Sequence, residues 1–259
     1  MNVKLPLIVC LLLTGSVNFL VAQDLNKEEN LEKRWKNNET KYFNCDVHFG
    51  HGLDNDGWND LRMGLLDVGF STYLHDGSLN LPTELDDFDL TYGGSLNFNL
   101  HVLRHRLPII SNALRLEYGL TLSWLQYKFS NDFRILEDTI PFTVEDDGTK
   151  YKKNKLKTTF LELPLLLTIT PGKNRSFYLS GGVFGGVLLG SKQKLKTETR
   201  DKIKIKDDFN LNKFRYGVIG RIGFGPIAFY AELGLNKLFK DGLGPELVPF
   251  NIGISLLNY

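Results

Sequence analysis

The sequence predicts an all-β protein, an eight-stranded antiparallel up-and-down transmembrane β-barrel. Three observations predict it. They are an N-terminal export signal, a series of segments in which apolar and polar residues alternate, and links between these segments that are alternately long and short. The composition agrees, because 25 Gly, 18 Phe and 10 Tyr in 259 residues suit curved sheets and aromatic girdles better than helical bundles.

Residues 1–22 have the parts of a secretory signal peptide. Lys4 supplies the positive charge, residues 5–13 are apolar, and Ala22 ends a segment suited to cleavage. The alternative is a membrane anchor, but a helical span needs about 20 consecutive apolar residues. The apolar run is shorter, and Gly15, Ser16 and Asn18 prevent it from continuing. We therefore expect export with cleavage after residue 22.

Composition excludes several other classes. A net charge of +1 gives no reason to expect a nucleic-acid partner, which needs a basic patch or stripe. After residue 22 no apolar run is long enough for a transmembrane helix, so a membrane-embedded mature chain must be a closed barrel. Cleavage leaves Cys45 as the one thiol, so no internal disulfide is possible. We expect no cofactor.

The alternation is clearest in residues 114–129. Leucine and aromatic residues occupy the even positions up to Trp124, while Arg115, Glu117 and small polar residues occupy the odd ones. Such a run is long for a soluble strand and typical of a tilted membrane strand. Weaker versions of the pattern occupy residues 65–74, 92–102, 159–169, 177–189, 214–224, 227–235 and 250–256. The total is even, as a single-chain bacterial barrel requires.

The links between these segments alternate in length. Long links follow the first, third, fifth and seventh segments, and the longest cover residues 131–154 and 191–212. The three others are shorter, and one is only Gly225-Pro226. Outer-membrane barrels have long outer loops and short periplasmic turns, so both termini are predicted to be periplasmic. The expected organisation is a signal peptide at 1–22, a periplasmic N-terminal segment at 23–63 and an outer-membrane barrel at 64–259.

Acidic and basic residues gather on the polar faces of the predicted strands. The set is Asp67, His101, Arg115, Glu117, Glu162, Arg215, Arg221 and Glu232. The lumen of an eight-stranded barrel is just wide enough for side chains to fill it, and buried charges must pair. We therefore predict a structural charge network, with an ion or solute pathway as the alternative. A soluble lipocalin-like barrel would have the inverse facing, with an apolar lumen and a polar outside.

A metal site is the second hypothesis that the residues raise. Cys45, His48 and His51 are ligand types that hold zinc. A spacing of three places the two histidines on opposite faces of an extended segment, so we assign no metal site. Residues 54–57 (DNDG) lack the closing Glu of a calcium loop and are predicted to form a turn.

The third hypothesis is an enzymatic site. A lipid-modifying barrel would need a Ser, His and acid group at one rim. His75, Asp76 and Ser78 have these residue types without the spacing of a motif. We expect a polar loop tip, no catalytic residue and no enzymatic activity.

Residues 191–212 contain alternating lysines, with Glu198, Asp201 and Asp207 among them. This alternation with a period of two predicts that the strands on either side of the link extend past the membrane. Contact with anionic lipopolysaccharide or a partner protein is one interpretation, and a solvated hairpin is the other.

Five segments of the sequence follow one another in an order that is typical of one protein family. They are YGGSLNFNLHVL, LRLEYGLTLSWLQYKF, LKTTFLELPLLLTITP, FYLSGGVFGGVLLGSKQKLK and FGPIAFYAELGLNKLFKDGLGPELVPFNIGIS. Over residues 58–259 the chain resembles the PorT-like outer-membrane β-barrel domain proteins of Bacteroidetes. The resemblance implies an integral outer-membrane barrel. The founding member takes part in protein secretion and gliding, so such a machinery role, with other envelope proteins as partners, is the alternative to a non-enzymatic structural, adhesive or complex-forming role.

Overall fold

The computed structural model describes most of the second of two compact units, which spans Cys45–Tyr259. The described residues are 48–49, 60–63, 65–110, 113–136, 143–145, 148–171, 177–199 and 201–256. The predicted signal peptide lies outside these residues. Within them, no helix is long and apolar enough to cross a membrane.

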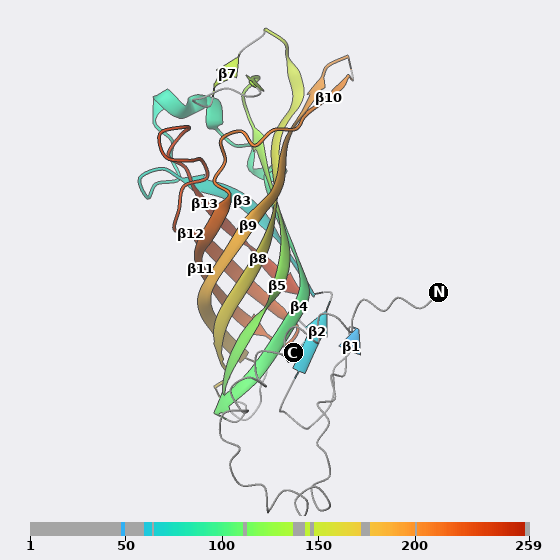
Figure 1. Cartoon of the computed structure of the whole chain (residues 1–259), viewed down its shortest axis with the longest axis vertical. Coiled ribbons are helices and arrows are strands. Elements are labelled where there is room, and N and C mark those ends of the chain that lie inside the picture. Colours follow the sequence, from blue (N-terminus) through green and yellow to red (C-terminus); the bar gives the residue numbers. More distant parts are fainter. Residues whose placement is uncertain are drawn as a thin grey trace, which may run out of the picture. The chain divides into compact units, whose positions relative to one another are not determined.

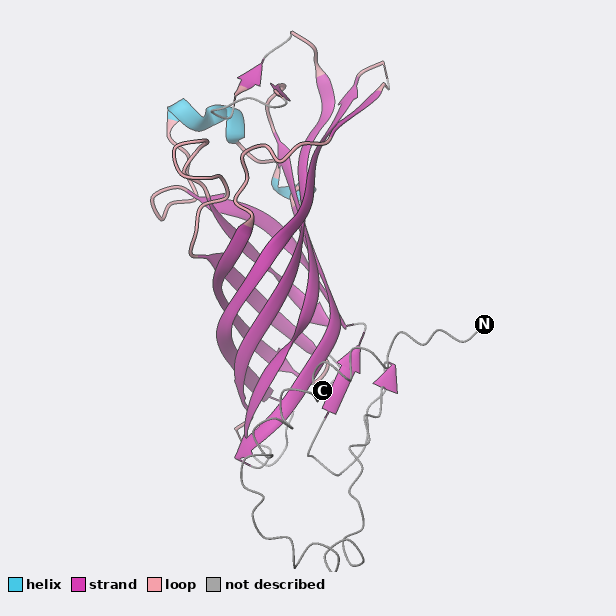
Figure 2. Ribbon diagram, in the orientation of Figure 1, coloured by secondary structure: helices cyan, strands magenta, loops and turns pink. Residues whose placement is uncertain are grey.

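Eight long strands close into a ring. They are β3 (Leu65–Leu74), β4 (Leu96–Ile110), β5 (Leu114–Phe129), β8 (Tyr151–Ile169), β9 (Phe177–Thr197), β11 (Phe214–Phe224), β12 (Ile227–Gly234) and β13 (Val248–Leu256). Each pairs antiparallel with the next, and β13 pairs with β3 to complete the ring (Figures 1 and 2). The predicted eight-stranded antiparallel barrel is confirmed.

Burial alternates along the strands as the sequence pattern predicted. In β11 every second residue is buried, so Arg215 and Arg221 face inward while Val218 and Ile222 face outward. Large apolar side chains on the outside of the other strands include Phe70, Phe98, Leu163, Leu165, Leu167, Leu179, Val183, Phe229 and Ile254. This is the facing that lipid requires, and it is the inverse of a lipocalin-like barrel.

One connection differs from the expectation. Residues 104–112, between the segments predicted at 92–102 and 114–129, were expected to be one of the shorter links, but β4 continues through most of this range. A β-bulge between His101 and Leu103 gives β4 one extra residue relative to β5. Because side chains alternate with a period of two, the extra residue changes which positions face inward. Arg104 and Arg106 therefore point into the barrel, where both are buried.

Two strands are longer than the segments at 159–169 and 177–189. β9 continues to Thr197, as the alternating lysines of residues 191–212 predicted. β8 begins at Tyr151 rather than at residue 159, which the sequence pattern did not predict. β10 (Lys202–Ile205) folds back on β9 as a hairpin, which extends beyond the ring at the end where the long loops gather (Figure 1).

Strand pairing also begins earlier than the expected barrel boundary at residue 64. β2 (Asp60–Met63) pairs antiparallel with β4, in the same register as β3. β1 (His48–Phe49) pairs parallel with β2. The predicted N-terminal segment therefore contributes at least these two short strands to the sheet.

Glycines on one strand accommodate aromatic rings from the next. Tyr178 of β9 lies opposite Gly223 of β11, and Phe184 lies opposite Gly217. A Cβ atom at either glycine would collide with the facing ring. Narrow barrels are filled by such alternation of small and large residues, which accounts for the richness of the sequence in both glycine and aromatic residues.

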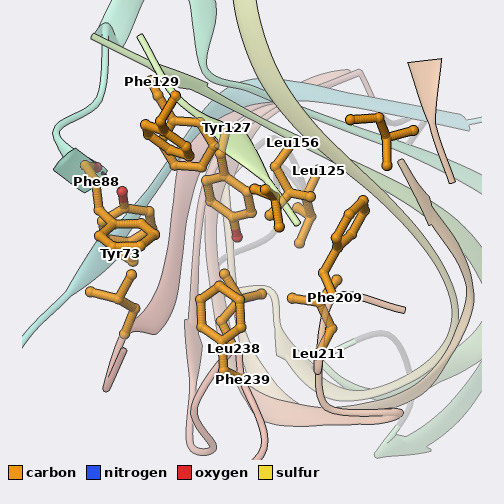
Figure 3. Close-up of a cluster of buried hydrophobic side chains, with 14 of the residues drawn as sticks. Tyr73, Phe88, Leu125, Tyr127, Phe129, Leu156, Phe209, Leu211, Leu238 and Phe239 are labelled. Carbon is orange, nitrogen blue, oxygen red and sulfur yellow. Dashed lines mark hydrogen bonds between the residues drawn. The ribbon is translucent and has the colours of Figure 1, made fainter. Parts of the chain in front are cut away.

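The long loops form an apolar core over one end of the ring. It combines Phe88, at the end of the 3-10 helix η2 (Thr83–Phe88), with Phe209 and Phe239 from two later loops. These pack with side chains from the upper part of β5, including Leu125 and Tyr127 (Figure 3). The remaining short elements are η3 (Tyr92–Gly94), β6 (Arg134–Ile135) and β7 (Val144–Glu145). We call the apolar core around Phe88, Phe209 and Phe239 the loop cap. The sequence pattern did not predict it.

Candidate functional site: the charged lumen

The first group of lumen charges surrounds Asp67. Its Oδ2 accepts hydrogen bonds from His101 Nε2 at 3.0 Å and from an Arg221 amino group at 3.1 Å. The other imidazole nitrogen, Nδ1, lies 2.8 Å from Thr121 Oγ1. Hydroxyl, imidazole and carboxylate thus form a relay like those of nucleophilic enzymes. Thr121 is only 3% exposed, so a substrate has no access to this hydroxyl.

The second group has Arg215 between two glutamates. One of its amino nitrogens lies 2.5 Å from Glu162 Oε1, and the other lies 3.5 Å from Glu232 Oε2. Gly186 lies between Arg215 and Glu162 in the register of the sheet. Because glycine has no side chain, the guanidinium of Arg215 reaches across β9 to the carboxylate. Arg215, Glu162 and Glu232 are each 3% exposed.

The third group is built by the bulged part of β4. Arg104 donates from Nε to Glu117 Oε2 at 2.9 Å, and Arg106 Nε lies 3.7 Å from Glu117 Oε1. Thr168 donates its hydroxyl hydrogen to the same Oε1 at 2.8 Å. The sequence reasoning identified Glu117 but missed both arginines, because strict alternation cannot anticipate a bulge.

Amide side chains join the first two groups. Asn99 Nδ2 donates to Glu232 Oε1 at 3.1 Å and contacts Asp67 Oδ2 at 3.5 Å. Asn251 Nδ2 donates to Glu232 Oε2 at 3.0 Å. Among the residues whose side chains the structure describes, four buried carboxylates face four buried arginines and His101 in the interior. The formal charges of the carboxylates and arginines cancel.

The structure brings together seven of the eight predicted lumen residues. Asp67, His101, Glu117, Glu162, Arg215, Arg221 and Glu232 are all at most 3% exposed. Arg115 differs, since it is only partly buried and donates to Thr170 Oγ1 at 2.8 Å near one end of β5 and β8.

The predicted loop tip is a tight turn. His75 and Ser78 form a two-residue hairpin turn whose central residues, Asp76 and Gly77, have φ of 49° and 77°. The imidazole of His75 approaches the Glu246 carbonyl oxygen at 3.0 Å. Ser78 Oγ accepts the backbone N–H of Asn80 at 3.1 Å. The serine hydroxyl is thus held by its own loop.

Metal ligands do not cluster in the part of the chain that the structure describes, where no group of three or more His, Cys, Asp or Glu side chains could hold an ion. Cys45, His51 and residues 54–57 lie outside the described residues, and only the backbone of His48 is described.

The chain was compared with known protein families and solved structures. The family described as "Outer membrane protein beta-barrel domain" matches residues 13–246. The chain belongs to this family. Membership of this family places the chain in the outer membrane. The apolar outer surface of the barrel agrees with this location. The solved structure of Ail, the attachment invasion locus protein of Yersinia pestis, is similar with 13% identity and a TM-score of 0.32, covering 76% of this chain and 95% of that one. No curated protein matches the chain.

Proposed function

We propose that this outer-membrane barrel is a non-enzymatic structural or complex-forming component that passes no solute and acts through its outward loops. The observation that carries the proposal is the filled lumen. Balanced ion pairs occupy the interior of the ring, and the loop cap covers one end.

An ion pathway would require these pairs to separate. Removing one partner from a buried ion pair costs about 3–5 kcal/mol, and several such pairs lie in series along this lumen. A permeating ion would also have to displace the aromatic side chains of the loop cap, such as Phe88 and Phe239. This favours a rigid scaffold over a channel.

The long loops are proposed to face the cell exterior, with both chain termini periplasmic. Leu66 near the start of β3 pairs with Leu256 at the end of β13, so the barrel begins and ends at one rim. The loop cap lies at the other rim, as in barrels with long outer loops and short periplasmic turns. The native thiol is first removed by Cys45→Ser. A cysteine then placed at exposed Gly242 should react with a membrane-impermeant maleimide on intact cells; one placed at Pro226, in the β11–β12 turn, should react only after lysis. The reverse labelling would contradict the orientation.

The partners of such a component are tested by photo-cross-linking in native membranes. A cross-linking residue at exposed Leu79 or Gly242, both in long loops, should capture the same envelope proteins reproducibly, while the same residue at lipid-facing Phe229 should not. Capture of secretion or gliding proteins would support the PorT-type alternative. Capture at none of the loop positions would contradict a complex-forming role.

The absence of enzymatic activity is part of the proposal. A lipid A hydrolase assay on the purified protein should show no turnover above background, with His75→Ala indistinguishable from the wild type. Turnover that is lost in His75→Ala would favour a lipid-modifying enzyme.

A further inference from the structure

Nine lysines from four neighbouring strands form an outward-facing array, which we call the lysine grid. Its members are Lys128, Lys153, Lys155, Lys157, Lys192, Lys194, Lys196, Lys202 and Lys204. One row crosses four strands in register, because Lys155 pairs with Lys128 on one side and Lys194 on the other, and Lys194 pairs with Lys204. The residues beside them in sequence, such as Leu156 and Leu195, are buried. The lysines therefore point away from the interior.

The grid holds like charges unusually close. Neighbouring strands are about 4.8 Å apart, and Cβ atoms of directly opposite residues are about 5 Å apart, so like charges in such pairs are destabilising. Six direct lysine pairs occur here: the three in the row above, Lys157 with Lys192, Lys153 with Lys196 and Lys196 with Lys202. Across the described residues, none of the nine forms an ion pair with a carboxylate.

Two members of the grid that lie beyond the membrane-spanning part of β8 have lowered pKa values. Burial, followed by the neighbouring charges of Lys153, Lys128 and Lys194, lowers the pKa of Lys155. Burial and neighbouring lysines likewise lower the pKa of Lys157. An anion placed against the grid would relieve this repulsion.

The position of the grid indicates where that anion comes from. On β8, the outward residues Leu163, Leu165 and Leu167 belong to the apolar band. Lys157 precedes Leu161 by four residues and so lies nearer the end of β8 that joins the long loops. At about 3.3 Å per residue and a tilt of about 40°, Lys157 lies about 10 Å above Leu161. The lowest lysines therefore reach the headgroup layer, and the higher rows extend above it.

We propose that the lysine grid binds the phosphate groups of anionic glycolipids in the outer leaflet. This inference rests on the proposed orientation, with the long loops outside. The grid continues the lipid-facing surface of the barrel wall, so it faces neighbouring lipids sideways rather than the medium above. Lysine ammonium groups donate charge-assisted hydrogen bonds to phosphate oxygens, and several phosphates can be held at once by three rows.

The experiment measures glycolipid retention by the full chain refolded in phosphatidylcholine vesicles. The probes are a bisphosphorylated lipid A, the same lipid without phosphates, and a soluble sulfated polysaccharide. The wild type should enrich the phosphorylated lipid over the dephosphorylated one. The variant Lys155→Gln/Lys157→Gln/Lys194→Gln should lose about five-fold in affinity per lysine removed. The remaining binding should weaken as salt rises.

A matched variant separates a specific surface from overall charge. Lys150→Gln/Lys213→Gln/Lys240→Gln removes the same charge outside the grid and should bind lipid A like the wild type. Heat-modifiable gel migration checks that each variant is folded. Equal loss in both variants, or equal binding of phosphorylated and dephosphorylated lipid, would overturn the proposal. So would grid-dependent binding of the polysaccharide without binding of the lipid. The maleimide labelling described above tests orientation separately, so failure of the two proposals can be told apart.

Discussion

Replacing Arg215 by methionine tests whether the lumen charges are as dry and as closely paired as their geometry indicates. The guanidinium contacts both Glu162 and Glu232 and lies over the Phe184 ring, 4.6 Å from its centroid. Methionine keeps an unbranched apolar side chain but removes the charge. Two carboxylates, each on a residue that is 3% exposed, then lose their shared counter-ion.

The expected loss of unfolding free energy follows from these contacts. Breaking a buried ion pair by removing one partner costs about 3–5 kcal/mol, and the lost cation–π contact adds about 0.5–2 kcal/mol. A loss of about 3.5–7 kcal/mol is therefore expected for Arg215→Met. Adding Glu162→Gln and Glu232→Gln should recover much of it, because neutral amides leave no unpaired charge.

The assay is urea-induced unfolding in phosphatidylcholine vesicles, followed by tryptophan fluorescence, with the denaturant slope checked for constancy. Lys213→Met is the matched control, since Lys213 is exposed and surface changes usually stay within about 0.5 kcal/mol. A loss below about 1 kcal/mol for Arg215→Met, or no recovery in the triple variant, would refute the reasoning.

Three further predictions address the packing, the loop cap and the lysine grid. Gly223→Val should cost about 1–3 kcal/mol in the same unfolding assay, because its side chain would meet the Tyr178 ring; an unchanged midpoint would contradict the fit. Phe239→Ala should cost about 3–5 kcal/mol locally and speed proteolysis of the outer loops while heat-modifiable migration persists; unchanged proteolysis would argue against the loop cap. Lys155→Gln/Lys157→Gln should raise stability near pH 7 in zwitterionic lipid by about 0.2–1 kcal/mol for each like-charged pair removed. The folded pKa values of Lys155 and Lys157 lie below the usual 10.5. Between the folded pKa and 10.5 the unfolded chain binds more protons, so the free energy of unfolding of the wild type rises with pH in this range. The double variant should show a smaller rise, and an identical slope would contradict the prediction.

Much of the architecture could be predicted because the period of two in a strand is a local property. Asp67, Glu117 and Arg215 were assigned to the lumen face from their immediate neighbours, and the structure buries all three. Arg104 and Arg106 were not predicted to face the lumen. A single bulged residue reverses the inward and outward positions of the part of β4 that follows it.

The loop cap and the lysine grid were missed for a different reason. Phe209 and Phe239 lie in loops, where no periodicity marks a buried residue. The lysines of residues 191–212 stood out in the sequence, but their alignment with Lys128 and Lys155 depends on cross-strand register. Register is set by pairing between distant segments, and alternation within one segment does not specify it.

Single-channel recording in planar bilayers tests the central claim, that the lumen is filled and sealed, most directly. The wild-type barrel, refolded and verified by its gel migration, should give no steady current at moderate voltage and high salt. The positive control replaces four buried side chains by alanine: Tyr127, Arg215, Arg221 and Tyr230, whose hydroxyl donates to Asn97 Oδ1 inside the barrel. The refolded control, checked by the same gel migration, should give measurable conductance. A stable, porin-like current from the wild type would contradict the account.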